Sequence, residues 1–123
     1  MAKILVVDDE SSIRLLYAQE LAEEGYEVTT AATAVEAVEK LGMSDYDLVV
    51  LDIKLKNESG LDLLQKIVKE RHEMMVILST AFSCYKDDFS AWLADSYVVK
   101  SSDMQELKDE IKRLLAKKEQ RRG

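Results

Sequence analysis

The stretch LVVLD, residues Leu48–Asp52, decides the fold, because four consecutive apolar residues end abruptly in a carboxylate. An unbroken apolar run of this length is typical of a strand that is buried on both faces, as in a parallel sheet. Comparable runs are found at Ile4–Val7, Val76–Leu78 and Tyr97–Val99. A weaker run, Tyr26–Thr30, alternates apolar and polar residues as an edge strand does. The sequence therefore predicts five strands.

Segments with a helical period lie between these runs. Their apolar residues share one face in each segment, beginning with Ile13, Leu16, Tyr17 and Leu21, then Ala34, Val35, Val38 and Leu41, then Leu61, Leu64, Ile67 and Val68, and finally Leu107, Ile111, Leu114 and Leu115. A further short helix is expected between Lys86 and Leu93. Thr33 and Ser59 are helix start signals, and Gly25 and Gly42 lie where the first two helices are expected to end.

Strands that alternate with helices form βαβ units, which build a parallel sheet covered on both faces. We expect one α/β domain over residues 1–123, with a doubly wound five-stranded parallel sheet and five helices. The strand order 2-1-3-4-5 places the alternating second strand at an edge. Ligands of such sheets bind beyond the carboxyl ends of the strands, so the site is sought there.

The composition excludes several classes of function. The chain has 24 acidic residues against 17 Lys and Arg, a net charge of −7, which argues against non-specific nucleic-acid binding. The single cysteine, Cys84, cannot form an intramolecular disulfide. The first apolar run stops at Asp8 and is too short for a signal peptide or a membrane span, so we expect a cytoplasmic protein.

The predicted strands deliver polar side chains at their carboxyl ends. These are Asp8, Asp9 and Glu10 after the first strand, Asp52 after the third, Thr80 at the end of the fourth and Lys100 after the fifth. Clustered carboxylates repel each other unless a cation intervenes, and a hard, oxygen-rich site suits magnesium (Mg²⁺). An aspartate can also accept a phosphoryl group, whose oxygens then need partners such as an ammonium and a hydroxyl. Asp8 and Asp9 would also suit plain capping of the first helix.

Taken in order and at these spacings, the motifs resemble the receiver domain of two-component response regulators across essentially the whole chain. The matching pieces are Val7–Glu10, Leu51-Asp52, Gly60 eight residues after Asp52, Thr80-Ala81 and Tyr97–Lys100.

The resemblance implies a flavodoxin-like fold and a phosphorylation switch rather than an enzyme. It implies that Asp52 is the phosphoacceptor, with Thr80 and Lys100 beside it, and that Thr80 and Tyr97 form a switch pair. The residues implied around the Mg²⁺ ion are Asp8, Asp9, Asp52 and the backbone carbonyl of Lys54. The implied phosphoryl donor is a phosphohistidine on a sensor histidine kinase or phosphotransfer protein, and the output is a downstream protein target in a phosphorelay.

The sequence departs from the family pattern after Lys100, and two other residues are expected to affect the lifetime of the phosphoryl group. Ser101 follows Lys100 where family members usually have proline, so we expect either a trans bond with a shifted loop or a strained cis bond, which costs about 3–4 kcal/mol. Lys54 and Phe82 lie two residues after Asp52 and Thr80, respectively. Side chains at these positions can flank the water molecule that hydrolyses the phosphoaspartate. An apolar ring at Phe82 would exclude that water and predicts a long-lived phosphoaspartate.

The leading interpretation is a stand-alone response regulator, because the last helix is expected to end near Lys118. The alternatives are a receiver fragment of a longer transcriptional regulator, a metal-dependent phosphatase with an aspartyl nucleophile, and an interaction module that works without phosphorylation. The phosphatase is disfavoured because those enzymes usually carry a second acid where Lys54 stands. The interaction module is disfavoured because the whole chemical set for phosphorylation is present.

Overall fold

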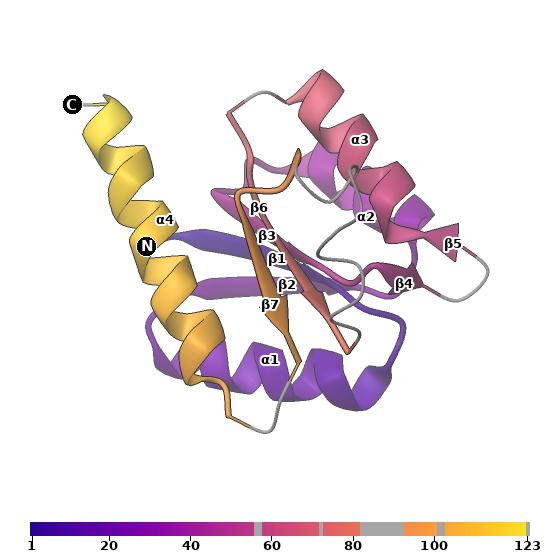
Figure 1. Cartoon of the computed structure of the whole chain (residues 1–123), viewed down its shortest axis with the longest axis horizontal. Coiled ribbons are helices and arrows are strands. Elements are labelled where there is room, and N and C mark those ends of the chain that lie inside the picture. Colours follow the sequence, from indigo (N-terminus) through magenta and orange to yellow (C-terminus); the bar gives the residue numbers. More distant parts are fainter. Residues whose placement is uncertain (56–57, 72, 82–92, 101–102, 123) are drawn as a thin grey trace.

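Five parallel strands form the centre of the computed structural model, which describes residues 1–55, 58–71, 73–81, 93–100 and 103–122. The strands are β1 (Lys3–Val7), β2 (Glu27–Ala31), β3 (Leu48–Leu51), β6 (Met75–Thr80) and β7 (Ser96–Val99). Their order in the sheet is β2-β1-β3-β6-β7 (Figure 1), which confirms the predicted doubly wound arrangement. β2 is at an edge of the sheet and is only partly buried, as its alternating sequence predicted.

Four helices lie within the described residues: α1 (Ser11–Glu23), α2 (Ala34–Met43), α3 (Gly60–Glu70) and α4 (Gln105–Arg122). The helix expected at Lys86–Leu93 falls almost entirely on residues 82–92, which lie outside the described residues. The structure adds a feature that the sequence did not predict, an antiparallel pair formed by β4 (Lys54–Leu55) and β5 (Glu58–Ser59). This pair lies between the end of β3 and the start of α3 (Figure 1).

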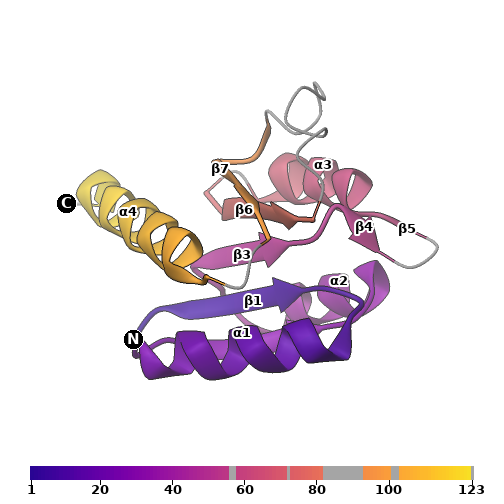
Figure 2. The same ribbon diagram turned by 60° about the horizontal axis from the view of Figure 1, so that its bottom comes forward.

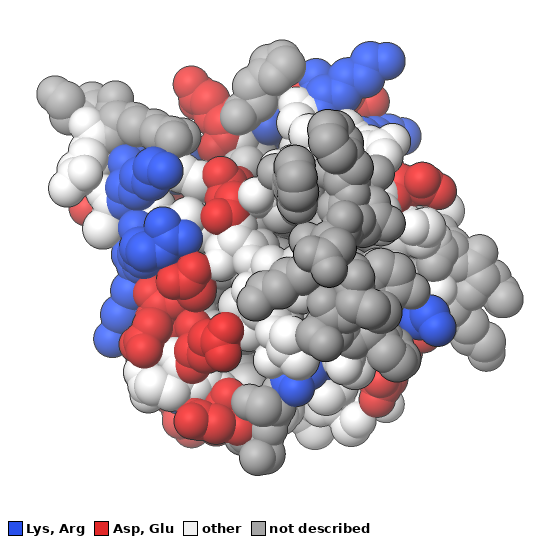
Figure 3. All heavy atoms as spheres, in the orientation of Figure 1, with Lys and Arg blue, Asp and Glu red and all other residues white. Residues whose placement is uncertain are grey.

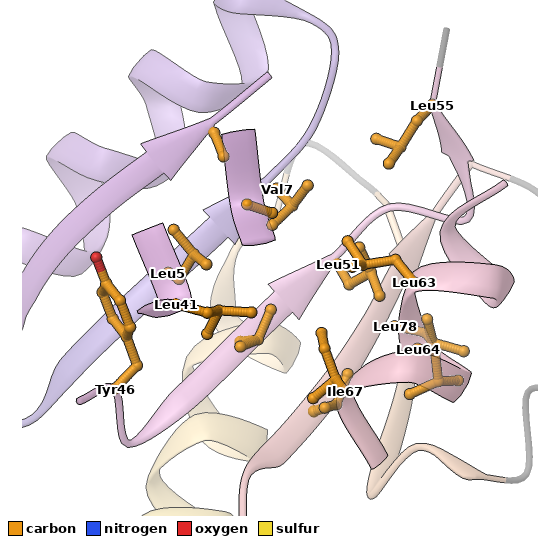
Figure 4. Close-up of a cluster of buried hydrophobic side chains, with 14 of the residues drawn as sticks. Leu5, Val7, Leu41, Tyr46, Leu51, Leu55, Leu63, Leu64, Ile67 and Leu78 are labelled. Carbon is orange, nitrogen blue, oxygen red and sulfur yellow. The ribbon is translucent and has the colours of Figure 1, made fainter. Parts of the chain in front are cut away.

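The helices cover both faces of the sheet, with α1 and α4 on one side and α2 and α3 on the other (Figure 2). Successive residues of a strand point to opposite faces, so β1 contributes Leu5 and Val7 to the α2–α3 side and Ile4 and Val6 to the other. Figure 4 shows the first of these clusters, in which leucines of the strands meet leucines of α2 and α3. Because helices cover both faces of the sheet, the central strands are buried on both sides, which explains their unbroken apolar sequences.

Local signals set some of the helix ends. The Thr33 side chain accepts a hydrogen bond from the Glu36 backbone N–H at 3.1 Å, which starts α2 as predicted. Gly25 has a φ of 93°, and its N–H donates to the carbonyl of Ala22 after α1 ends. The prediction for Gly42 was wrong, because α2 continues through Gly42 to Met43.

Ion pairs join α4 to its neighbours. Lys108 lies 3.0 Å from Glu20 of α1, and Lys118 lies 3.4 Å from Asp47. In Figure 3, basic side chains gather over α4 with acidic side chains next to them in the direction of α1. The partly exposed pairs contribute little free energy, so the apolar face of α4 accounts for most of its docking. Among the described residues, no helix has both the length and the apolar character that crossing a membrane requires.

Candidate functional site

Strand register brings two aspartates together at the carboxyl edge of the sheet. Val7 of β1 pairs with Leu51 of β3, so Asp8 and Asp52, the next residues, leave adjacent strands at the same level. The backbone N–H of Asp52 donates to the carbonyl of Val7 at 2.9 Å, which keeps the two chains together as far as this point. Both carboxylates are buried, with exposed fractions of 2% for Asp8 and 5% for Asp52. Such burial is costly without a compensating cation.

Lys100 supplies that cation from the end of β7. Its Nζ lies 2.6 Å from Asp8 Oδ2 and 3.1 Å from Asp52 Oδ2, and 12% of its side chain is exposed. The backbone N–H of Lys100 also donates to the carbonyl of Thr80 at 2.6 Å. The structure therefore brings together Asp8, Asp52 and Lys100, as the strand-end argument predicted, and ties Lys100 to Thr80 through the backbone. The predicted place of the Thr80 hydroxyl at the site remains a prediction.

Burial and charge act against each other at this site. Burial, with the nearby charge of Asp8, raises the pKa of Asp52 from 3.8 to about 6, although the Lys100 ammonium opposes this shift. For Lys100, burial lowers the pKa, but the hydrogen bond to Asp8 and the charges of both aspartates outweigh it, so its pKa is raised. The Lys100 ammonium therefore stays charged, while the pKa of the Asp52 carboxyl lies close to the physiological pH range.

An acidic loop follows β1. Asp8, Asp9 and Glu10 each offer a carboxylate oxygen, and these oxygens lie within 4.8 Å of one another. Asp8 Oδ1 accepts the Glu10 backbone N–H at 2.9 Å, and Arg14 Nη1 donates to the Asp8 carbonyl at 2.7 Å. Asp9 is half-buried and Glu10 exposed, so the loop opens towards solvent. This oxygen-rich, partly open donor set fits a hydrated Mg²⁺ ion.

Thr80 and Tyr97 lie on the same face of the sheet. Thr80 pairs with Val99 and Leu78 pairs with Tyr97 in the β6–β7 register, so both side chains project towards the α2–α3 side. Thr80 is fully buried, and Tyr97 is half-buried against the cluster that contains Leu78. Thr80 and Tyr97 are therefore diagonal neighbours on the adjacent strands β6 and β7, and their role as a switch pair remains a prediction.

Gly60 is required by a close backbone approach. A Cβ atom at this position would lie 1.9 Å from the Asp52 carbonyl oxygen, and the Gly60 N–H donates to the carbonyl of Ile53 at 2.6 Å. Only glycine lets the start of α3 pass this close to the aspartate. The spacing of Gly60 from Asp52 therefore has a steric cause.

Of the remaining predicted site residues, only Lys54 lies within the described part of the chain. The Lys54 backbone N–H donates to Asp52 Oδ1 at 3.3 Å, and its side chain is exposed beside the site. That the backbone carbonyl of Lys54 is a ligand of the Mg²⁺ ion remains a prediction. Phe82 and the Lys100–Ser101 bond lie outside the described residues.

Two contacts at the site escaped the sequence argument. Arg14, on the first turn of α1, holds the Asp8 carbonyl, and Tyr17 of α1 shares a buried hydrogen bond with Ser79. The sequence assigned Tyr17 only to an apolar helix face and gave no separate role to Ser79, which directly precedes Thr80. No local pattern in the sequence pairs two residues so far apart along the chain.

Known proteins resemble this chain in both sequence and structure. A family model described as the response regulator receiver domain matches residues 4–112. A crystal structure of the response regulator TrrA from Thermotoga maritima, in complex with Mg²⁺ and BeF, is 49% identical and has a TM-score of 0.90, covering 93% of this chain and 99% of that one. TrrA has also been crystallised with the histidine kinase ThkA, and that match is 50% identical with a TM-score of 0.88, over 94% of this chain and 99% of that one.

A more distant relative differs in length. The response regulator ArlR of Staphylococcus aureus is 32% identical over 98% of this chain, but the match spans only 56% of ArlR. The chain therefore corresponds to about half the length of that curated relative.

Proposed function

This chain belongs to the response regulator receiver domain family, and from that premise we propose that Asp52 accepts a phosphoryl group from a phosphohistidine. The observation that carries the proposal is the position of Lys100 Nζ, 2.6 Å from Asp8 and 3.1 Å from Asp52. An ammonium in this place can neutralise charge on a group bound to Asp52. For a plain strand-end aspartate, burial beside a second carboxylate would be a cost with no function to offset it.

The transfer is a displacement at phosphorus. A carboxylate oxygen of Asp52 forms a bond to phosphorus while the phosphorus–nitrogen bond of the donor breaks, and the nitrogen leaves with the electron pair. The transferred group has three peripheral oxygens that need partners. Lys100 would hold one of them and the Thr80 hydroxyl a second. The donor is proposed to be a sensor histidine kinase or phosphotransfer protein, and the TrrA–ThkA complex supports this class of partner.

We propose that Asp8, Asp9 and Asp52 hold Mg²⁺, together with the backbone carbonyl of Lys54. The clustered oxygens of the acidic loop and the burial of Asp8 support this assignment. Mg²⁺, when bound, would neutralise carboxylate charge and the charge of the third phosphoryl oxygen. TrrA, which shares 49% of its sequence with this chain, was crystallised with Mg²⁺ and BeF.

The proposed output is a two-state change centred on Thr80 and Tyr97. A phosphoryl group on Asp52 would draw the Thr80 hydroxyl towards it, and the Tyr97 ring would fill the space behind. The half-buried position of Tyr97 on the same face as Thr80 supports this pairing. The altered surface around β6 and β7 would then bind a downstream protein target in the cytoplasm.

The chemistry is tested with acetyl phosphate and Mg²⁺, followed by intact mass spectrometry. We expect a gain of about 80 Da, the mass of one phosphoryl group. The gain should vanish with Asp52→Asn and persist with Asp45→Asn, which changes an exposed aspartate in the segment before β3, away from the end of the strand that Asp52 follows. Phosphorylation of the Asp52→Asn variant at the wild-type rate would contradict the proposal.

A further inference from the structure

A buried hydrogen bond joins α1 to the end of β6. Tyr17 Oη and Ser79 Oγ lie 3.1 Å apart, although 62 residues separate them in the sequence. The exposed fractions are only 4% for Tyr17 and 1% for Ser79. A hydroxyl buried this deeply needs a hydrogen-bond partner, and Tyr17 and Ser79 are partners of each other.

The hydrogen bond reaches the part of β6 that extends past its pairing with β3. The pairing of β3 with β6 ends at Leu51 and Leu78, because β3 gives way to Asp52. Ser79 and Thr80 therefore lie beyond the paired residues of β3, and they pair with Val98 and Val99 of β7. Tyr17 provides a restraint from the helix layer, on the face opposite to the Thr80 side chain.

The Tyr17 phenol lies close to the charged site. Burial raises the pKa of the Tyr17 hydroxyl above its ordinary value, although the hydrogen bond to Ser79 and the charge of Lys100 oppose this. α1 begins directly after the acidic loop. One hydrogen bond therefore connects the helix that follows the proposed metal ligands to the strand that carries the proposed hydroxyl partner of the phosphoryl group.

We propose that Tyr17 is a positioning residue for phosphoryl transfer, which through Ser79 holds the end of β6 where Thr80 meets the phosphoryl group. The inference rests on the proposed function of Asp52. With the backbone at the end of β6 held in place, only the Thr80 side chain has to reorient to meet the phosphoryl group, and this costs less than ordering the strand end as well. The hydrogen bond therefore contributes to the transfer rate, without touching the reacting atoms.

The test uses Tyr17→Phe, Ser79→Ala and the double variant of the full chain, with acetyl phosphate at saturating Mg²⁺ and intact mass as the readout. Each single variant should be phosphorylated roughly two- to tenfold more slowly, the range expected from losing one buried hydrogen bond. The double variant should be no slower than the slower single variant, because both changes remove the same contact. The Mg²⁺ affinity, measured by calorimetry, should be unchanged.

Tyr46→Phe is the matched control. It removes a phenol oxygen from another buried tyrosine, which precedes β3 at the opposite end of the sheet, and the rate should stay at the wild-type value. Wild-type rates in both single variants, additive effects in the double variant, or a loss of Mg²⁺ affinity equal to the loss of rate would each overturn the inference. Failure of the wild-type chain to be phosphorylated at all would instead defeat the proposed function.

Discussion

Burial of the Asp52 carboxyl links its protonation to folding. Its pKa is raised from 3.8 to about 6, so the folded state holds the proton more tightly than the unfolded chain does. The resulting stabilisation is present below pH 3.8 and is lost as the pH rises through about 6. At neutral pH and without metal, the ionised carboxylate therefore destabilises the fold, as charged groups at functional sites often do.

Asp52→Asn is therefore expected to stabilise the metal-free protein. The free energy of unfolding should rise by about 1–3 kcal/mol at neutral pH, because the amide carries no charge to desolvate and Lys100 keeps its contact with Asp8. The gain should shrink as the pH falls below about 6, where wild-type Asp52 is itself protonated. Urea unfolding in EDTA at several pH values measures this. A gain that grows on acidification would contradict the assignment of the raised pKa.

Gly60 makes a second prediction for a single residue. Gly60→Ala should destabilise the protein by roughly 1–3 kcal/mol, because the new methyl group would overlap the Asp52 carbonyl oxygen. Gly42→Ala is the control, since a Cβ there meets open space within α2 and should stabilise by about 0.5 kcal/mol. Equal effects of the two substitutions in urea unfolding would show that the close approach at Gly60 has no importance.

At the scale of elements, a short signal determines where α2 begins. The Thr33 hydroxyl satisfies the Glu36 N–H, which would otherwise lack a partner within α2. Thr33→Ala should therefore lower the free energy of unfolding by about 1 kcal/mol. Thr33→Ser keeps the hydroxyl and should cost much less. If both variants lose the same stability, the effect comes from the lost methyl group and not from capping.

At the scale of the whole molecule, the acidic loop and the end of β3 should respond together to metal. Mg²⁺ at about ten times its dissociation constant should stabilise the folded state by about 1.4 kcal/mol, which raises the melting temperature by a few degrees. Asp9→Asn should remove most of this rise, and Asp45→Asn should leave it intact. An equal rise with sodium chloride of the same ionic strength would indicate screening of the net charge of −7 and not binding at a site.

The sequence by itself determined the sheet and the location of the site. Unbroken apolar runs such as Leu48–Leu51 are local signals for buried strands, and the alternation at Tyr26–Thr30 marked the edge. Parallel strands deliver their carboxyl ends to one edge, so the meeting of Asp8, Asp52 and Lys100 followed from strand order alone.

Only the tertiary structure decided how that site is supported. The bond between Tyr17 and Ser79 depends on how α1 lies on the sheet, and the requirement for Gly60 depends on how closely α3 approaches Asp52. The β4–β5 pair could likewise not be predicted from the sequence, because strands of two residues leave no periodic pattern. Periodicity reports which face of an element is buried. The partner of a buried hydroxyl is set by the packing of elements that are distant in the chain.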